Sequence, residues 1–342
     1  MVGRKMGSLR LYLITRVILA LPMIFILLFL IFVVLRVMPG DPVLAMLGDK
    51  APMAQIQEMR HQLGLDRPIY VQFFDYFLSL MRGDLGSSLI WGRRPISVEI
   101  LEHFPATLEL TISSMIVMLL VGVFTGAQSA YKRNSPTDYG FRTFGIVIYS
   151  IPVFWFGMIL QLIFGVYLRW LPIAGRIDPF LSPRAVTGLY TIDSLLSGDI
   201  LSFVSTMQHL ILPSLTLGLV LSGIFTRLTR VNMLDVLRQD FIAAARARGL
   251  KESAVLYKHA LKNAFIPILT MIGLQFALLL AGAVLTETTF SWPGMGSYLI
   301  ERINYRDFPA IQGAVVFFAL LVAAVSVAVD MIYAFLDPRI RY

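Results

Sequence analysis

Six long stretches without a charged side chain constrain the fold of this 342-residue chain more than any other feature. Each holds 19 to 27 residues without Asp, Glu, Lys or Arg; they are residues 17–35, 110–131, 143–168, 200–226, 263–286 and 308–329. A helix that crosses a bilayer needs about 17–25 mostly apolar residues. Buried helices of a soluble core rarely recur six times at this length. The sequence therefore predicts an all-α integral membrane protein with six transmembrane helices, the fourth crossing from about His209 onward.

The charged residues outside these stretches predict the orientation. Only 15% of residues are charged, against about 25% in an ordinary soluble domain, and the net charge is +8. With the N-terminus inside, the cytoplasmic segments hold 17 basic and 6 acidic residues, and the outer segments hold 12 and 15. Basic residues concentrate on the cytoplasmic side of membrane proteins. We therefore expect both termini in the cytoplasm, and the positive charge needs no nucleic-acid partner.

The long segment after the first stretch carries helix signals of its own. Helices are expected at residues 52–63, 68–81 and 96–103. Gly64 suits the position just past a helix end, and Pro105 is expected to start the second span. The expected parts of the chain are 1–38 with the first span, 39–104 as a helical extracytoplasmic cap, and 105–342 as the transmembrane core with a cytoplasmic loop at 227–262.

Several kinds of chemistry are missing from the sequence. None of the six lysines follows a glycine, so the chain has no Walker A loop for ATP. None of the four histidines belongs to an H-E-x-x-H metal motif. Proton- and ion-coupled carriers usually keep charged residues inside the membrane, and the six stretches have none. We therefore expect no catalytic residue, no metal site and no cofactor on this chain, and a stand-alone secondary transporter is disfavoured.

A few small and polar residues interrupt the apolar stretches. Gly122 and Gly126 form a G-x-x-x-G pattern, which permits close helix packing. Gln161, Ser222 and Gln275 have two interpretations. They either form hydrogen bonds between helices or line a pathway for a polar solute.

The cytoplasmic segment 227–262 is unusual for a membrane loop because it is rich in alanine and arginine. Asp240 is expected to cap a short helix, and Gly249 is expected to end it. Alanines at 243, 244, 245 and 247 make one face of this helix thin, and Arg246 and Arg248 could anchor it by charge-assisted hydrogen bonds. The segment either sits in a groove of another protein or contacts anionic lipid headgroups.

The same segment resembles the cytoplasmic signature of ABC-importer permeases, Glu-Ala-Ala-x3-Gly-x9-Ile-x-Leu-Pro. Here the signature reads Ala243-Ala244-Ala245, Gly249 and His259-Ala260-Leu261-Lys262, so that Ala243, His259 and Lys262 replace Glu, Ile and Pro. With these three departures, the segment is similar to the peptide-importer branch of the family. Further motifs that carry the resemblance lie at residues 39–42, 63–68, 83–86, 105–110, 150–155, 290–296 and 337–341.

This resemblance to the first of the two permeases of dipeptide and oligopeptide importers implies a type I ABC-importer fold in the bacterial inner membrane. It implies a second permease, two ATPase subunits that bind ATP and Mg²⁺, an extracytoplasmic solute-binding protein, a peptide substrate and surrounding lipid. Nickel, haem precursors and antimicrobial peptides remain alternative substrates. The residues expected to couple to the ATPase are Ala243, Ala244, Ala245, Arg246, Ala247, Arg248, Gly249, Leu250 and Leu261.

Overall fold

The computed structural model describes residues 5–37, 43–44, 51–62, 64–90 and 92–336. It contains two compact units. The first comprises residues Met1–Pro105 and Gly294–Ala324, and the second comprises Ala106–Pro293 and Val325–Tyr342. The motifs at 39–42 and 337–341 lie outside the described residues.

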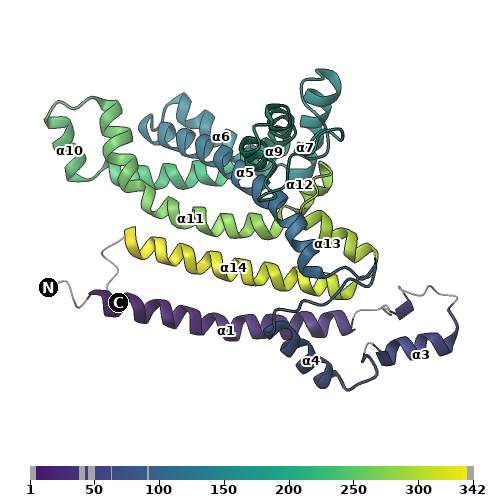
Figure 1. Cartoon of the computed structure of the whole chain (residues 1–342). Helices are drawn as coiled ribbons and strands as arrows, with labels where there is room; N and C mark the ends of the chain where they lie inside the picture. The colour runs from purple at the N-terminus through teal and green to yellow at the C-terminus, as the bar shows by residue number, and fades with distance from the viewer. Residues whose placement is uncertain (1–4, 38–42, 45–50, 63, 91, 337–342) are drawn as a thin grey trace. The chain divides into compact units, whose positions relative to one another are not determined.

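The first unit is built from helices, which Figure 1 labels and colours in chain order. They are α1 (Lys5–Val37), α3 (Met53–Gln62), α4 (Ile69–Met81), the first part of α5 (Ile96–Tyr131), α13 (Met295–Asn304) and most of α14 (Phe308–Leu336). Gly64 has φ +64°, and the amide of Leu65 donates to the carbonyl of Arg60 at 2.9 Å. This αL turn confirms the expected end of the first cap helix at Gly64.

The core of the first unit is an apolar cluster between α5, α13 and α14. Its buried members are Ile96, Ile100, Met295, Tyr298, Ala310, Ala314 and Phe318. Glu99 is buried beside this cluster and accepts from the Tyr298 hydroxyl at 2.8 Å and from Arg302 at 3.1 Å. The paired charge thus ties α5 to α13 inside one unit, because a buried carboxylate needs such partners.

The second unit is built around one long helix, α9 (Ile200–Leu237). The other elements are the rest of α5, α6 (Pro136–Ser150), α7 (Val153–Leu160), the π-helix η1 (Gln161–Tyr167), α8 (Tyr190–Leu196), α10 (Asp240–Ala247), the π-helix η2 (Ala254–Ala260), α11 (Leu261–Gly282) and α12 (Val284–Thr289). The α9 helix continues 11 residues past the apolar stretch 200–226, so that it enters the expected cytoplasmic loop as helix.

Glycines let α9 approach its neighbours at the distance of backbone contact. A Cβ atom on Gly126 of α5 would lie 2.6 Å from the Thr226 carbonyl oxygen, and one on Gly223 would lie 2.3 Å from the Gly145 carbonyl oxygen of α6. Hydroxyls join the same surfaces, since Thr125 lies 2.7 Å from Thr226 through their Oγ1 atoms. The G-x-x-x-G pattern therefore marks a true packing face, because Gly122 would also place a Cβ 2.5 Å from a side-chain atom of α9.

Two of the six apolar stretches are broken rather than straight. Helices Pro136–Ser150 and Val153–Tyr167 meet at an angle of 101°, because Ile151 is extended before Pro152. The fifth stretch bends by 58° at Pro267. A proline lacks an N–H and clashes with the preceding turn, which explains both breaks.

The helix expected at 96–103 and the helix expected from Pro105 are one helix, since α5 continues through this proline from Ile96 to Tyr131. Residues on both sides, including Ile100 and Ala106, are buried, and their packing holds the helix together across the lost hydrogen bond. Within the described residues, three helices are long and apolar enough to cross a membrane, or up to five if each bent pair is one span.

Candidate functional site

Helix α10 begins after the extended residue Gln239 and ends in a complete glycine turn. Gly249 has φ +74°, its amide donates to the Arg246 carbonyl at 2.9 Å, and the amide of Leu250 reaches the Ala245 carbonyl at 3.4 Å. These two bonds form a Schellman motif, which requires an αL residue. The structure therefore confirms that Gly249 ends the helix.

Asp240 does not cap α10 as the sequence suggested. It is already the first helical residue, and no side chain at the N-cap position forms a capping hydrogen bond. Its carboxylate lies in the first turn, where a negative charge stabilises the positive end of the helix dipole. Gln239 occupies the cap position through its extended backbone alone.

One face of α10 is anchored to the ends of the long helices. Ile242 and Ala245 are buried in an apolar cluster with residues of α5, α9, η2 and α11. Its other buried members are Ala127, Ala130, Met233, Val236, Val255, Leu256, Ala260 and Ala264, and Leu261 packs against them. This cluster therefore joins α10 to four other elements, α5, α9, η2 and α11.

The opposite face of α10 is exposed and thin. Ala243, Ala244 and Ala247 are exposed there, and so are Arg246, Arg248, Gly249 and Leu250. Arg246 pairs with Glu252 at 2.9 Å, and the Nε atom of Arg248 donates to the Ala244 carbonyl at 3.3 Å. Of the nine residues expected to couple to the ATPase, Ala245 and Leu261 thus lie against the cluster and the other seven face outward.

A buried ion pair joins two helices of the same unit, α6 and α9. Arg230 of α9 donates through two nitrogens to the two carboxylate oxygens of Asp138 on α6, each at 2.8 Å. Ser129 of α5 and the amide of Asn134 donate to the same carboxylate. The hydrogen bonds from Arg230 lower the pKa of Asp138 well below its ordinary value, with Ser129 and Asn134 adding to the effect against the opposing effect of burial. One carboxylate therefore joins α5, α6 and α9.

The three residues considered for a pathway lie in different surroundings. Gln161 donates to the carbonyls of Ile173 and Thr289, at 2.7 and 3.0 Å, and so holds the following loop and α12. Ser222 is fully buried against α5, and its hydroxyl donates to the Leu219 carbonyl at 2.6 Å. Gln275 is half-buried on α11. The three are not brought together.

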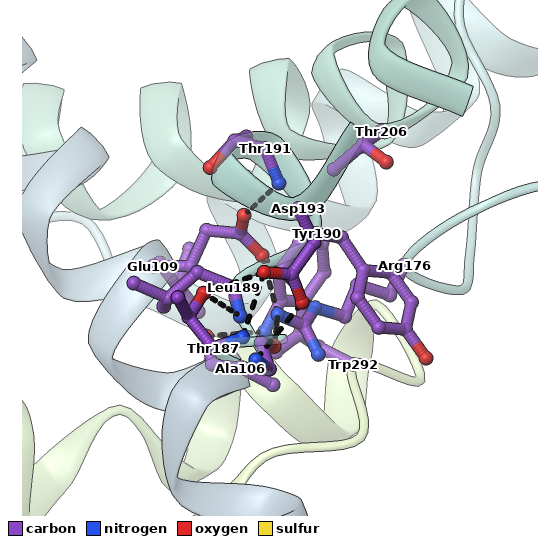
Figure 2. A network of polar contacts seen from close by, with 12 residues as sticks. Ala106, Glu109, Arg176, Thr187, Leu189, Tyr190, Thr191, Asp193, Thr206 and Trp292 are labelled. Carbon is purple, nitrogen blue, oxygen red and sulfur yellow. Dashed lines mark hydrogen bonds and ion pairs between the residues drawn. The ribbon is translucent and has the colours of Figure 1, made fainter. Parts of the chain in front are cut away.

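A second polar centre in this unit, drawn in Figure 2, was not predicted from the sequence. Arg176 and Glu109 form an ion pair at 2.8 Å, with 5% and 3% of their side chains exposed. The guanidinium also donates to the Gly188 carbonyl at 2.7 Å and lies 3.8 Å from the centre of the Tyr190 ring. Glu109 accepts from the Thr191 amide at 2.8 Å. This pair ties the loop between η1 and α9 to α5.

A second carboxylate folds that loop upon itself. Asp193 is buried and accepts from the amides of Val186, Thr187 and Gly188 at 2.8–3.1 Å. Trp292 lies beside this centre (Figure 2): its ring centre is 6.0 Å from the Arg176 guanidinium, and its indole N–H donates to the Ala106 carbonyl at 2.8 Å. Neither feature has a sequence motif. The only available signal was that Glu109 directly precedes an apolar stretch while Arg176 lies in a turn-rich segment.

These features define a class of protein: a helical membrane protein with a tightly packed helix block, a short helix with a thin exposed face and no metal-holding cluster among the described residues. Comparison with known proteins gives the family. The chain belongs to the inner membrane components of binding-protein-dependent transport systems; the family model matches residues 118–342, and the model of its N-terminal region matches residues 9–111. The protein is thus a multi-pass permease subunit of the bacterial inner membrane.

Individual relatives match over nearly the whole chain. A di/tripeptide transport system permease protein of Pseudomonas aeruginosa is 45% identical over 92% of this chain and 93% of its own length. A dipeptide transport system permease protein of Alkalihalophilus pseudofirmus is 42% identical over 97% and 99%. An inward-facing structure of the MetNI methionine ABC transporter has a chain that matches with a TM-score of 0.54 at 14% identity, over 70% of this chain and 97% of that one, which shows a shared fold.

Proposed function

We propose that this subunit forms half of the membrane pathway of an ATP-driven importer for dipeptides and oligopeptides. The names of the relatives with 42–45% identity support a peptide substrate. We propose six transmembrane helices with both termini in the cytoplasm, a topology supported by the basic residues of the 1–16 and 227–262 segments. The proposed parts are the first span within 1–38, an extracytoplasmic cap at 39–104 and the core at 105–342.

The single observation that carries the coupling role is the two-sided character of α10. Ile242 and Ala245 fix it to the ends of α5 and α9, while Ala243, Ala244 and Ala247 leave a thin face open to a partner. Small side chains permit close approach of another backbone, and the exposed arginines nearby can pair with acidic groups. We propose that this face sits in a groove of a partner ATPase, where ATP and Mg²⁺ are bound.

Transport then follows from moving α10. Closure of the ATPase dimer shifts α10, and the apolar cluster beneath it passes the shift to α5 and α9. The ion pair between Asp138 and Arg230 and the close glycine contacts keep α5, α6 and α9 together, so these three helices tilt as one body. A swing of the conformational equilibrium from 1:99 to 99:1 requires a differential binding of about 5.5 kcal/mol, which ATP must supply through this contact.

Selectivity is proposed to lie in the partner binding protein rather than in this subunit. The six apolar stretches hold no charged group that could recognise a peptide terminus. We expect that exchanging this permease for one from an importer with a different substrate range leaves the range of transported peptides unchanged. Transport specificity that follows the permease would contradict this assignment.

The coupling role is tested by copurification from native membranes. Ala244→Trp enlarges the exposed face of α10, and Ala54→Trp makes the same change on an exposed alanine of α3, outside the cytoplasmic segments. We expect Ala244→Trp to lose the ATPase subunits and peptide uptake while inserting normally, and Ala54→Trp to retain both. ATPase recovery equal in the two variants would overturn the docking assignment.

Growth of a deletion strain on dipeptides and under nickel limitation separates the peptide from the metal substrate.

A further inference from the structure

A polar pocket lies in the first unit, between the end of α1 and α4. Its volume is about 300 Å³, which is at the lower end of the range for small-molecule sites. Its lining includes the guanidinium groups of Arg36 and Arg67, the carboxylate of Asp75 and the side chains of Gln72 and Tyr76. The pocket therefore offers both signs of charge within a space large enough for a small charged group.

The Gln72 side chain is held in an orientation that leaves one of its polar atoms unused. Its amide nitrogen donates to the carbonyls of Leu65 and Arg67, at 3.2 and 2.7 Å. The Oε1 atom of the same amide is buried and has no hydrogen-bond partner among the described residues. A buried acceptor without a donor is destabilising, so this atom favours a donor from a ligand.

The charges of the pocket are only partly matched. Arg67 pairs with Asp75 at 3.1 Å, and both side chains are more than half exposed. The guanidinium carbon of Arg36 lies 5.3 Å from the centre of the Phe32 ring, and no carboxylate of the described residues pairs with this guanidinium. An anionic group beside Arg36 and an ammonium beside Asp75 and Gln72 Oε1 would complete the site.

The place of the pocket in the chain puts it at the edge of the bilayer. Arg36 ends the first apolar stretch, residues 17–35, where a membrane helix leaves the hydrocarbon region. One face of α4 packs on α1, since the Phe73 ring lies 5.3–5.7 Å from Phe25, Phe29 and Phe32. Figure 1 shows the two helices side by side.

The other face of α4 is apolar as well, yet it is uncovered. The side chains at one helical spacing along it are more than half exposed; they are Tyr70, Phe74, Leu78 and Met81. A helix that is apolar on both faces, with a polar pocket at its base, suits the boundary between acyl chains and headgroups. The aromatic residues suit the same depth.

We propose that this pocket binds the headgroup of a phospholipid with a primary ammonium, of the phosphatidylethanolamine type. The phosphate would receive hydrogen bonds from Arg36, as guanidinium groups match phosphate oxygens. The ammonium would donate to Gln72 Oε1 and to Asp75. The acyl chains would cover the exposed face of α4. A choline headgroup cannot do the same, because its quaternary nitrogen has no N–H.

The proposal is tested on the intact importer complex, purified and delipidated, by native mass spectrometry with added lipids. The probes are dioleoyl phosphatidylethanolamine, phosphatidylcholine and phosphatidylglycerol, together with free phosphoethanolamine and a dipeptide. We expect about tenfold greater retention of phosphatidylethanolamine than of the other two lipids. Equal retention of phosphatidylcholine, equal occupancy by phosphoethanolamine or the dipeptide, or a protein copurifying on this face would each overturn the proposal.

Variants assign the binding to this pocket. Arg36→Gln is expected to lower phosphatidylethanolamine retention about tenfold, and Arg36→Lys, which keeps the charge, is expected to restore most of it. Gln72→Leu should remove the preference over phosphatidylcholine. Arg82→Gln, an exposed arginine at the end of α4 and outside the pocket, is the matched control and should bind normally. Retention unchanged in both Arg36→Gln and Gln72→Leu would refute the site, and a melting temperature equal to that of the parent shows that each variant is folded.

Discussion

Glycines perform opposite tasks in two regions of the second unit. In the block formed by α5, α6 and α9, a Cβ on Gly223 would lie 2.3 Å from a backbone oxygen, far inside van der Waals contact. At the end of α10, a Cβ on Gly249 would meet no atom within 4 Å, but φ is +74°. The first glycine is required by its neighbours and the second by its own backbone. The helix block is therefore rigid through contact, whereas the α10 surface is shaped locally and left open.

The ion pairs repeat this contrast. Asp138 in the helix block is fully buried, and its partner Arg230 is 17% exposed. The pair of Arg246 and Glu252 beside α10 is 44% and 46% exposed. Buried pairs lose much when one partner is removed, and exposed pairs contribute about 0–1 kcal/mol. Substitutions should thus affect folding in the block and association at α10.

The largest expected effect is that of Gly223→Val. Its Cβ would collide with the Gly145 carbonyl oxygen, a backbone atom that cannot turn away, so the helices must separate. We expect destabilisation of about 3 kcal/mol or more and little folded protein in the membrane. Fluorescence-detected size-exclusion chromatography measures this yield. Gly140→Val on α6, where a Cβ meets nothing within 4 Å, is the matched control and should fold normally.

Asp138→Asn should have the next largest effect, about 3 kcal/mol, because it leaves the Arg230 charge partly buried without its partner. The pKa of Asp138 is lowered in the folded protein, chiefly by Arg230. Its stabilisation is therefore complete above the unfolded-state pKa and is lost as the pH falls below it. The unfolded-state pKa of an Asp is about 3.9, so the melting temperatures of parent and variant should differ by a nearly constant amount from about pH 7 to pH 4, and the difference should shrink as the pH falls from about 4 toward 2. A difference unchanged between about pH 4 and pH 2 would show that the pair does not act through its charge.

Gly249 separates local geometry from docking. Any side chain at φ +74° strains the turn by about 1 kcal/mol, and Asn should cost less than Ala. Because space is open around this residue, Ala and Trp should destabilise the isolated subunit equally.

In the assembled importer, however, we expect Gly249→Trp to impair ATPase association or coupling more than Gly249→Ala does. Uptake assays and ATPase copurification measure this difference. Normal peptide uptake by the Trp variant would contradict the proposed role of the α10 segment.

The smallest expected effect on folding is that of Glu252→Gln, which removes the exposed partner of Arg246. We expect a change of about 0.5 kcal/mol or less, reduced further at high salt. The guanidinium becomes free to bind an acidic partner group, so ATPase association should be retained or strengthened. Copurification at low and high salt tests both parts, and a large loss of thermal stability would remove the contrast between the two regions.

The sequence by itself predicted the class of the fold, the family signature and the end of α10, because these follow from local patterns. Each of these signals is local. The length of an apolar stretch, the side on which basic residues lie and the glycine that ends a helix each involve a few residues or a single span. It also indicated that Gly122 and Gly126 permit close contact, although it could not identify α9 as the partner. No local rule predicts the breaks at Pro152 and Pro267 or the continuation of the helix through Pro105. Whether a proline bends a helix or is accommodated within it depends on the packing around it.

Only the tertiary structure decided how the polar residues are used. Arg176 and Glu109 are 67 residues apart, and Asp138 and Arg230 are 92 apart, so no spacing rule links them. Folding brings each pair into an apolar surrounding, where an unpaired charge would be very costly. The sequence thus determined which segments are helical and apolar, whereas the packing of those helices decided which charges meet and which face of α10 remains open.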